Sequence, residues 1–313
     1  MNRIWGYISV MMAMIFFGIS NTFNKILLQT LDPIDLAALS YCLAAVFLFL
    51  ARYSPLKNRL SSFLDTGHDL EHFMSPKDYL ILFSTAILGI LIAPLLYLNG
   101  LKYSTAVNAS FLLIVEILFI ILIGILFLKE SFQRKDILAF FLLLLGTVLL
   151  LTGGNLENLF MSYSWGNMLI ILAAFCWSID TTLSKFLSFK SDIVLITALK
   201  SAIGGLLLLG LSASMGLKIQ MSLTYLPYLL FVGIFSIGTA LILIYLSIRI
   251  IGATRAGSLF SLASLFGAVS AFFILKEPFT IMQLFFGLLM LAGVLIFYLN
   301  GEQGTGDLKK MAR

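Results

Sequence analysis

Long apolar runs separated by short polar breaks dominate the chain. Ten such runs fall at 4–28, 34–51, 79–99, 104–128, 136–152, 164–187, 193–214, 224–247, 255–275 and 281–299. Most are close to the roughly 20 residues that a helix needs to cross the hydrocarbon core of a bilayer. Strands of a membrane barrel would instead alternate in polarity over about ten residues. The pattern therefore predicts an all-α membrane protein with ten transmembrane helices.

Composition supports lipid as the solvent of this chain. Of its 313 residues, 60% are hydrophobic and 11% are charged, whereas soluble domains carry about 25% charged residues. A soluble fold could not cover this much apolar surface. The net charge is +5, but the basic residues are dispersed between apolar runs, so we expect membrane lipid and no nucleic acid as a partner.

Topology follows from the distribution of the 20 Lys and Arg residues. With the N-terminus inside, Lys200 lies within a span and four fall outside, namely Lys25, Lys102, Lys218 and Lys276. The positive-inside rule favours this orientation. We therefore predict a multi-pass protein of the plasma (inner) membrane with both termini cytoplasmic. The polar segment 52–78 is then a cytoplasmic loop, and 301–313 a disordered cytoplasmic tail.

The sequence contains an internal repeat. At an offset of 160 residues the pattern W-G-x6-A-x5-I-x2-T-x2-K-x-L recurs, starting at Trp5 and at Trp165. At an offset of 147 residues, Lys129 and Glu130 match Lys276 and Glu277. The longer 52–78 segment absorbs the change of offset. The chain is therefore expected to consist of two five-helix units, at 1–153 and 164–300.

An odd number of spans in each unit makes the two units antiparallel. The second unit enters the membrane from the opposite side, so Lys25 and its equivalent Lys185 fall on opposite faces. Inverted repeats of this kind allow two related halves to rock about a site near the midplane. The repeat therefore favours transport as well as this architecture, although a duplication retained for stability would leave the same pattern.

These residues together resemble the EamA-type transporters of the drug/metabolite transporter superfamily. The resemblance rests on the two W-G…K first helices and on the two Lys-Glu pairs, and it covers essentially the whole chain. It implies a central cavity lined by helices 1–4 and 6–9, with helices 5 and 10 more peripheral. The chain departs from the family where Glu116 precedes Ile117 instead of proline, where Ala263 replaces the second Glu, and where Ser40 replaces an Arg whose second-half position is Lys200.

Ionisable residues at bilayer depth are costly, by about 3 kcal/mol or more, and are candidates for function. Glu116, Asp180 and Lys200 lie within the fourth, sixth and seventh apolar runs. Glu116 or Asp180 could bind a proton or a substrate ammonium group, and Lys200 could bind a carboxylate or neutralise one of the acids. The alternative is that these groups form internal pairs that fix helix packing.

Further candidates for the substrate or proton pathway are neutral. Asn21 and Thr22 lie in the first run, and Thr181 follows Asp180 in the sixth. Tyr97 and Tyr245 lie in the third and eighth runs, where we favour an interfacial position over substrate contact. Lys25 and Lys185 are interpreted as interfacial residues whose ammonium groups snorkel towards water.

The expected function is secondary active transport, or export, of small amino-acid-like or other polar and amphipathic metabolites by alternating access. Coupling to protons and exchange both remain open, as does a monomer or a homodimer. A flippase of a lipid-linked substrate is the main alternative, and an integral-membrane enzyme is a weaker one. No P-loop motif is present, so the chain itself is not expected to hydrolyse ATP. No catalytic residue, metal or cofactor is expected, and His68 and His72 are assigned to a solvated loop.

Overall fold

Regular structure is helical throughout the described part of the computed structural model, which comprises residues 3–53, 75–127, 134–152, 164–188, 193–217, 219–251, 256 and 259–301. Seven helical stretches in these ranges are long and apolar enough to cross a membrane. Three shorter apolar helices at Ile137–Leu150, Leu262–Leu275 and Ile281–Ile296 bring the set to ten. The prediction of an all-α protein with ten membrane helices is confirmed.

The helices of the first half begin with the two long spans. In chain order they are α1 (Arg3–Leu27), α2 (Pro33–Tyr53), α4 (Pro76–Ala86), the π-helix η1 (Ile87–Ile92), α5 (Ala93–Tyr103), α6 (Ala106–Leu112), α7 (Val115–Leu126) and α8 (Arg134–Thr152). Both ends of the expected 52–78 loop are helical. The start of α4 is fixed by Ser75, whose hydroxyl accepts from the Asp78 N–H while its own N–H donates to the Asp78 carboxylate. Residues 54–74 lie outside the described part.

The helices of the second half follow the same order. They are α9 (Ser164–Ser188), α10 (Ile193–Ser214), the 3₁₀ turn η3 (Leu223–Tyr225), α11 (Leu226–Leu230), the π-helix η4 (Phe231–Thr239), α12 (Ala240–Ile251), α14 (Leu262–Ser270), the π-helix η5 (Ala271–Leu275) and α15 (Ile281–Gly301). The described chain ends at Gly301, so the expected tail lies almost entirely outside it.

Helix packing follows the repeat. The helices α2 and α10 are equivalent in the two halves and pack on each other, as do α8 and α15. The helix α1 packs on α12 and α14, just as its equivalent α9 packs on α5 and α7. Exchanging the two halves therefore maps each of these contacts onto an equivalent one, as expected for twofold-related units.

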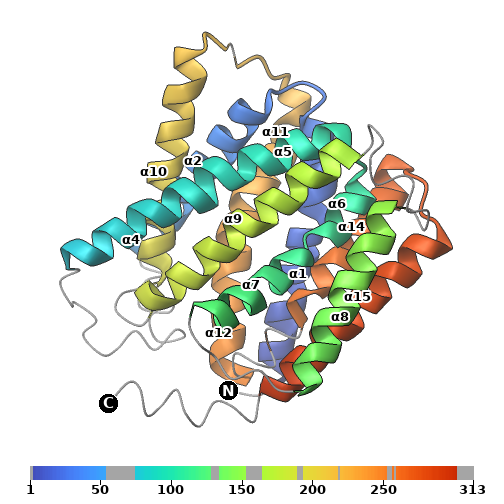
Figure 1. Ribbon diagram of the computed structural model, residues 1–313. Helices are drawn as coiled ribbons and strands as arrows, with labels where there is room; N and C mark the ends of the chain where they lie inside the picture. Colours follow the sequence, from blue (N-terminus) through green and yellow to red (C-terminus); the bar gives the residue numbers. More distant parts are fainter. Residues whose placement is uncertain are drawn as a thin grey trace.

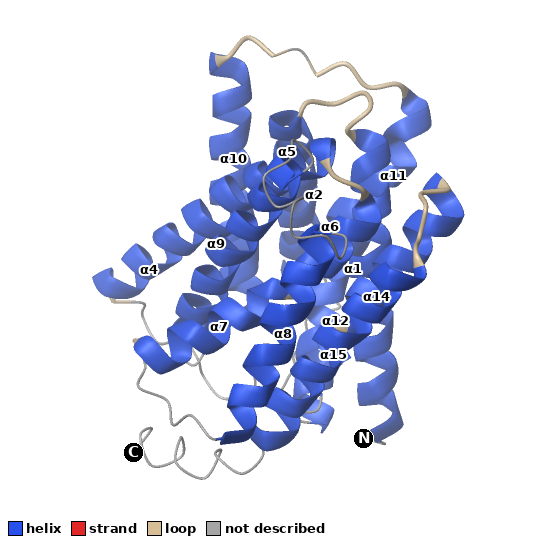
Figure 2. Ribbon diagram, turned by 45° about the vertical axis from the view of Figure 1, so that its right-hand side comes forward, coloured by secondary structure: helices blue, strands red, loops and turns tan. Residues whose placement is uncertain are grey.

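The two halves run in opposite directions. The start of α1 and the end of α15 lie at the same end of the molecule (Figures 1 and 2), which we call the proximal end; the opposite one is the distal end. The helix α9 starts at the distal end, near the upper right of Figure 1, and runs back towards the proximal end. The predicted inverted repeat is thus visible in the path of the chain.

The outer surface is apolar. The helices α8 and α15 lie side by side at one edge of the bundle (Figure 1), the peripheral position implied by the resemblance for helices 5 and 10. Phe141 and Leu144 of α8 and Phe285 and Leu288 of α15 are all exposed. Large apolar side chains on an outer surface are stable against lipid but not against water.

Regular α-helix is interrupted at matching places in both halves. The π-helices η1 and η4 lie in the third span of each half. In the fourth span, Glu116 and Ile117 donate their backbone N–H groups three residues back, to Leu113 and Ile114, and Ser264 does the same to Ser261 at the equivalent place. Such π and 3₁₀ stretches within a helix often mark hinges or functional sites.

Close contact between α5 and α9 depends on glycine. A Cβ atom added at Gly166 would lie 2.7 Å from the Gly100 carbonyl oxygen and 2.9 Å from the Tyr103 carbonyl carbon. Both neighbours are backbone atoms, so the helices themselves would have to separate.

We expect Gly166→Val to lower the free energy of unfolding by about 1–3 kcal/mol, the usual cost of overpacking. The matched control is Gly210→Val, because a Cβ at Gly210 meets nothing within 4 Å. Thermal unfolding of both purified variants measures the difference. Equal midpoints for the two would contradict the close packing of α5 on α9.

Candidate functional site

Four side chains form a stripe along one face of α9. Trp177 lies four residues before Thr181, and Asp180 lies four residues before Ser184, so these side chains share one side of the helix. The first-half equivalents, at the 160-residue offset, are Phe17, Ser20, Asn21 and Asn24. The repeat therefore places an aromatic and polar stripe on the first helix of each half.

Asp180 and Lys200 form an ion pair inside the bundle. The Lys200 ammonium group donates to the Asp180 carboxylate and to the Ser184 hydroxyl, the latter at 2.9 Å. Ser184 in turn donates to Asp180 at 3.0 Å. The two charged side chains are 14% and 10% exposed, respectively. Of the two roles predicted for Lys200, neutralisation of an acid is the one that this geometry supports.

The π-helix η1 packs against this part of α9 through Gly89. The Trp177 indole N–H donates to the Gly89 carbonyl oxygen at 2.9 Å. A Cβ atom at Gly89 would collide with the Asp180 carboxylate. Only glycine at position 89 leaves room for the Asp180 carboxylate. The carbonyl oxygen of Gly89 also fixes the position of the Trp177 indole. One backbone position of the first half thus positions two side chains of the second.

Glu116 lies beside the stripe, in the first turn of α7. Its Oε1 atom accepts a hydrogen bond of 3.0 Å from the Thr181 hydroxyl, a contact that joins the two halves. Glu116 is partly buried and Thr181 is exposed. Within the described ranges Glu116 has no cationic partner, in contrast to Asp180.

Asn21 connects three spans through buried hydrogen bonds. Its side-chain oxygen accepts from the Tyr97 hydroxyl at 2.7 Å, and its amide donates to the Ser110 hydroxyl at 3.0 Å. Ser110 donates to the Ala106 carbonyl at 2.7 Å. Thr22, the next residue, contacts Ser270 of α14 at 2.6 Å between hydroxyl oxygens, so this network reaches the second half as well.

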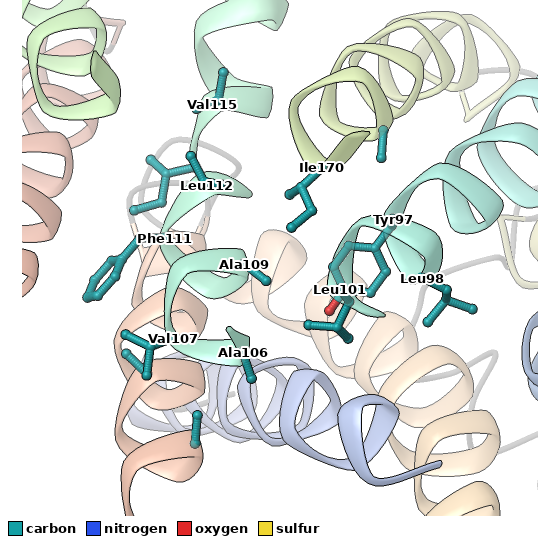
Figure 3. Packing of buried hydrophobic residues seen from close by; sticks show 14 of the residues in the cluster. Tyr97, Leu98, Leu101, Ala106, Val107, Ala109, Phe111, Leu112, Val115 and Ile170 are labelled. Carbon is teal, nitrogen blue, oxygen red and sulfur yellow. The ribbon is translucent and has the colours of Figure 1, made fainter. Parts of the chain in front are cut away.

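The predicted interfacial position of Tyr97 is wrong. Its side chain is 4% exposed and lies among core residues of α5, α6 and α9, including Leu101, Ala109 and Ile170 (Figure 3). Its ring also lies 5.5 Å from that of Trp177. The bond to Asn21 makes burial of the phenol favourable, because a buried hydroxyl needs a partner. The side chain of Tyr245, in contrast, lies outside the described residues.

The prediction that Lys25 snorkels is also corrected. Its ammonium group donates to the backbone carbonyls of Leu101 and Ser104, at 2.5 and 2.6 Å. These carbonyls close the end of α5, where a cation is favourable. Lys25 therefore ties α1 to the distal turn between α5 and α6. The side chain of its equivalent Lys185 lies outside the described residues.

Glu277 holds the other side of the same turn, a role that the sequence analysis did not assign. Its two carboxylate oxygens accept from the backbone N–H groups of Ala106 and Val107, both at 3.0 Å. These groups begin α6 and have no intrahelical acceptor. The recurrence of Lys-Glu at 276–277 was the available signal, but its spacing does not reveal that the acid caps a helix in the other half.

Lys276 orients this acid through its backbone. It has φ 55°, a left-handed conformation unusual for a residue with a side chain, and it ends η5. We expect Lys276→Gly to keep or raise stability, and Lys276→Val to lower the free energy of unfolding by about 1–2 kcal/mol, because a β-branched residue is disfavoured there. Thermal unfolding of the pair of variants tests this. A valine variant as stable as the glycine variant would contradict the left-handed turn.

Asp35 is a buried acid to which the sequence analysis assigned no role. It lies in the first turn of α2, is 3% exposed, and accepts from the Ser212 hydroxyl of α10.

In the described part of the chain, no three His, Cys, Asp or Glu side chains come together to hold a metal ion.

Comparisons with known proteins agree with one another. The model of the EamA-like transporter family matches residues 4–152 and 164–299. A protein of Methanothermobacter thermautotrophicus named "Uncharacterized transporter" is 48% identical over 96% of this chain and 88% of its own length. One of the same name from Archaeoglobus fulgidus is 27% identical over 90% and 93%.

A solved structure described as "Crystal structure of protein" resembles the fold. It superposes with a TM-score of 0.59 at 15% sequence identity, and the match covers 93% of this chain and 98% of the other. At that identity the likeness concerns the fold alone. The family model covers nearly the whole chain in two stretches, and the relatives bear the name of transporters. The chain is therefore an integral, multi-pass membrane protein that belongs to the EamA-like transporter family.

Proposed function

We propose that the protein is a secondary transporter that moves small polar or amphipathic metabolites by alternating access, with the stripe on α9 and Glu116 forming its substrate and proton site. The observation that carries this proposal is the contact between Glu116 of the first half and Thr181 of the second. If the two halves rock against each other, the hydrogen bond between Thr181 and the Glu116 carboxylate would form in one state and break in the other. Ionisable groups within membrane spans commonly mark such pathways.

Asp180 and Glu116 have different roles in this proposal. Asp180 is neutralised by Lys200 and held by Ser184, so in this proposal it has a structural role in the site. Glu116 has a single neutral donor, Thr181, among the described residues. It is therefore the group assigned to carry a proton or to meet a positively charged part of the substrate. Both a proton gradient and exchange would use a carboxylate in this way.

Unequal contacts between equivalent helices support alternating access. At the crossing of α1 and α14, a Cβ at Gly18 would lie 2.7 Å from the Ala263 oxygen, and Thr22 bonds Ser270 in a buried contact. The equivalent crossing of α9 and α7 contains the Thr181–Glu116 contact, and Thr181 is exposed. Exchanging these two arrangements would close one end and open the other, which is the alternating-access motion of inverted-repeat transporters.

The orientation in the membrane is part of the proposal. Following the positive-inside rule, the proximal end would face the cytoplasm, with both termini, and the membrane would be the plasma membrane. The distal end, where Lys25 and Glu277 hold the α5–α6 turn, would face outward. Because one chain contains both halves, a single copy could form the pathway, either as a monomer or within a homodimer.

The test is uptake into proteoliposomes that contain the purified protein. The panel comprises amino acids, nucleotide-like metabolites and polyamines, each assayed with and without a pH gradient, and protein-free liposomes are the control. We expect accumulation of at least one solute class above the control. If no solute is moved while a fluorescent lipid crosses between leaflets, the proposal fails in favour of lipid flipping.

A further inference from the structure

When Glu116 is ionised, its negative charge has no compensating cation among the described residues of the site. Asp180 and Lys200 cancel each other, and Lys25 is committed to backbone carbonyls at the distal end. Glu116 accepts from the neutral Thr181 and has no cationic partner in the described part of the chain. A lone carboxylate at this depth is unfavourable, so an occupant with one positive charge would improve the site.

The same geometry disfavours an additional negative charge on the ligand. Lys200 is the cation nearest the stripe among the described residues, and its ammonium group is occupied by Asp180 and Ser184. A carboxylate on the ligand would have to displace Asp180, which lies against Gly89. The site is thus better matched to an amine than to the corresponding amino acid.

Aromatic side chains lie one turn from Glu116 on α7 and one turn from Thr181 on α9. Trp177 lies one helical turn from Thr181 on the same face of α9, and its indole is fixed by the bond to Gly89. Tyr97 lies beside Trp177, with ring centroids 5.5 Å apart. Phe119 lies one turn from Glu116 on α7 and contacts Phe175, with ring centroids 5.2 Å apart. Tryptophan faces attract ammonium groups and offer an apolar contact for the rest of a ligand.

We propose that the ligand class of this site is small monocationic amines with an aromatic or apolar tail, held by Glu116 through the ammonium group and by Trp177 through its ring. This inference rests on the proposed function and narrows it. The amine carries no carboxylate, so Lys200 remains with Asp180. Bound amine and Glu116 together leave the site without net charge.

Three probes with the same carbon framework test the charge requirement. Phenethylamine is cationic, L-phenylalanine adds a carboxylate to it, and 3-phenylpropionate carries only a negative charge. Isothermal titration of each into the purified full-length protein in lipid nanodiscs measures the affinity. We expect phenethylamine to bind at least about tenfold more tightly than phenylalanine, a difference of about 1.4 kcal/mol in binding free energy. We expect no binding of 3-phenylpropionate, because its negative charge would lie beside Glu116.

Variants locate the interaction. Glu116→Gln is expected to weaken phenethylamine binding about 10- to 100-fold, the range of a hydrogen bond to a charged group, and Glu116→Asp to retain part of it. Trp177→Leu is expected to weaken it several-fold. The matched control is Asp32→Asn, because Asp32 is an exposed acid between α1 and α2 and its loss should leave the affinity unchanged.

Any of three results would overturn the inference: no binding of phenethylamine, tighter binding of phenylalanine or 3-phenylpropionate, or an affinity that Glu116→Gln leaves unchanged. Transport of another solute class in the liposome assay, with no amine binding, would reject this ligand class while leaving the proposed transport function in place.

Discussion

Replacing Lys200 with methionine is expected to lower the free energy of unfolding by about 3–5 kcal/mol. Methionine keeps much of the apolar stem of lysine but removes the ammonium group that neutralises Asp180. The carboxylate would stay wedged against Gly89 with the Ser184 hydroxyl as its remaining donor. A buried charge that has lost its partner costs far more than the pair contributes, which is why the expected effect is large.

Thermal or denaturant unfolding in detergent micelles measures this effect. The double variant Lys200→Met with Asp180→Leu should recover most of the lost stability, because it removes the stranded charge together with its partner. Lys102→Met is the matched control, since Lys102 is an exposed residue of α5. A single variant as stable as the control would mean that Asp180 and Lys200 are not paired in the folded protein.

Replacing Glu116 with glutamine is expected to reduce gradient-driven accumulation of substrate about 10- to 100-fold. Glutamine keeps the size of the side chain and can still accept from Thr181, but it neither releases a proton nor carries a negative charge. The lost interaction is of the charge-assisted kind, about 1.5–3 kcal/mol, and each 1.4 kcal/mol corresponds to a factor of ten. Glu116→Asp preserves the charge and is expected to keep part of the activity.

The measurement is uptake into proteoliposomes with an imposed pH gradient, at equal amounts of folded wild type, Glu116→Gln and Asp32→Asn. The exposed Asp32 serves as the control for loss of one acid. Wild-type accumulation by the glutamine variant would return Glu116 to a packing role and require another coupling group.

The span in which a charged residue lies could be predicted from the sequence, but not the partner that it finds there. Asp180 and Lys200 were both recognised as intramembrane charges, and the structure joins them across α9 and α10. Tyr97 and Lys25 were assigned to the interface because each falls near the end of an apolar run. Both are instead engaged inward, by Asn21 and by the end of α5. Proximity to a span end says nothing about which side of the helix faces a polar neighbour.

Glu277 shows the same limit more sharply. Its recurrence at the repeat was visible in the sequence, yet the groups that donate to its carboxylate are backbone N–H groups 171 and 170 residues earlier in the chain. Every helix start has free N–H groups, so no pattern can single out α6 as the one that this carboxylate reaches. The left-handed backbone at Lys276 that aims it is equally invisible, because lysine carries no preference for that conformation.

By itself, the sequence determined the class of solvent, the number of spans and the inverted repeat. Apolar runs of fixed length can be satisfied only by helices in lipid, and an odd number of spans per unit reverses the second unit. The tertiary structure alone decided which polar groups meet. It paired Asp180 with Lys200 and left Glu116 with the neutral Thr181. The reason is that contacts between spans depend on helix rotation, tilt and local π or 3₁₀ geometry, and small shifts in these exchange one polar partner for another without changing the apolar pattern.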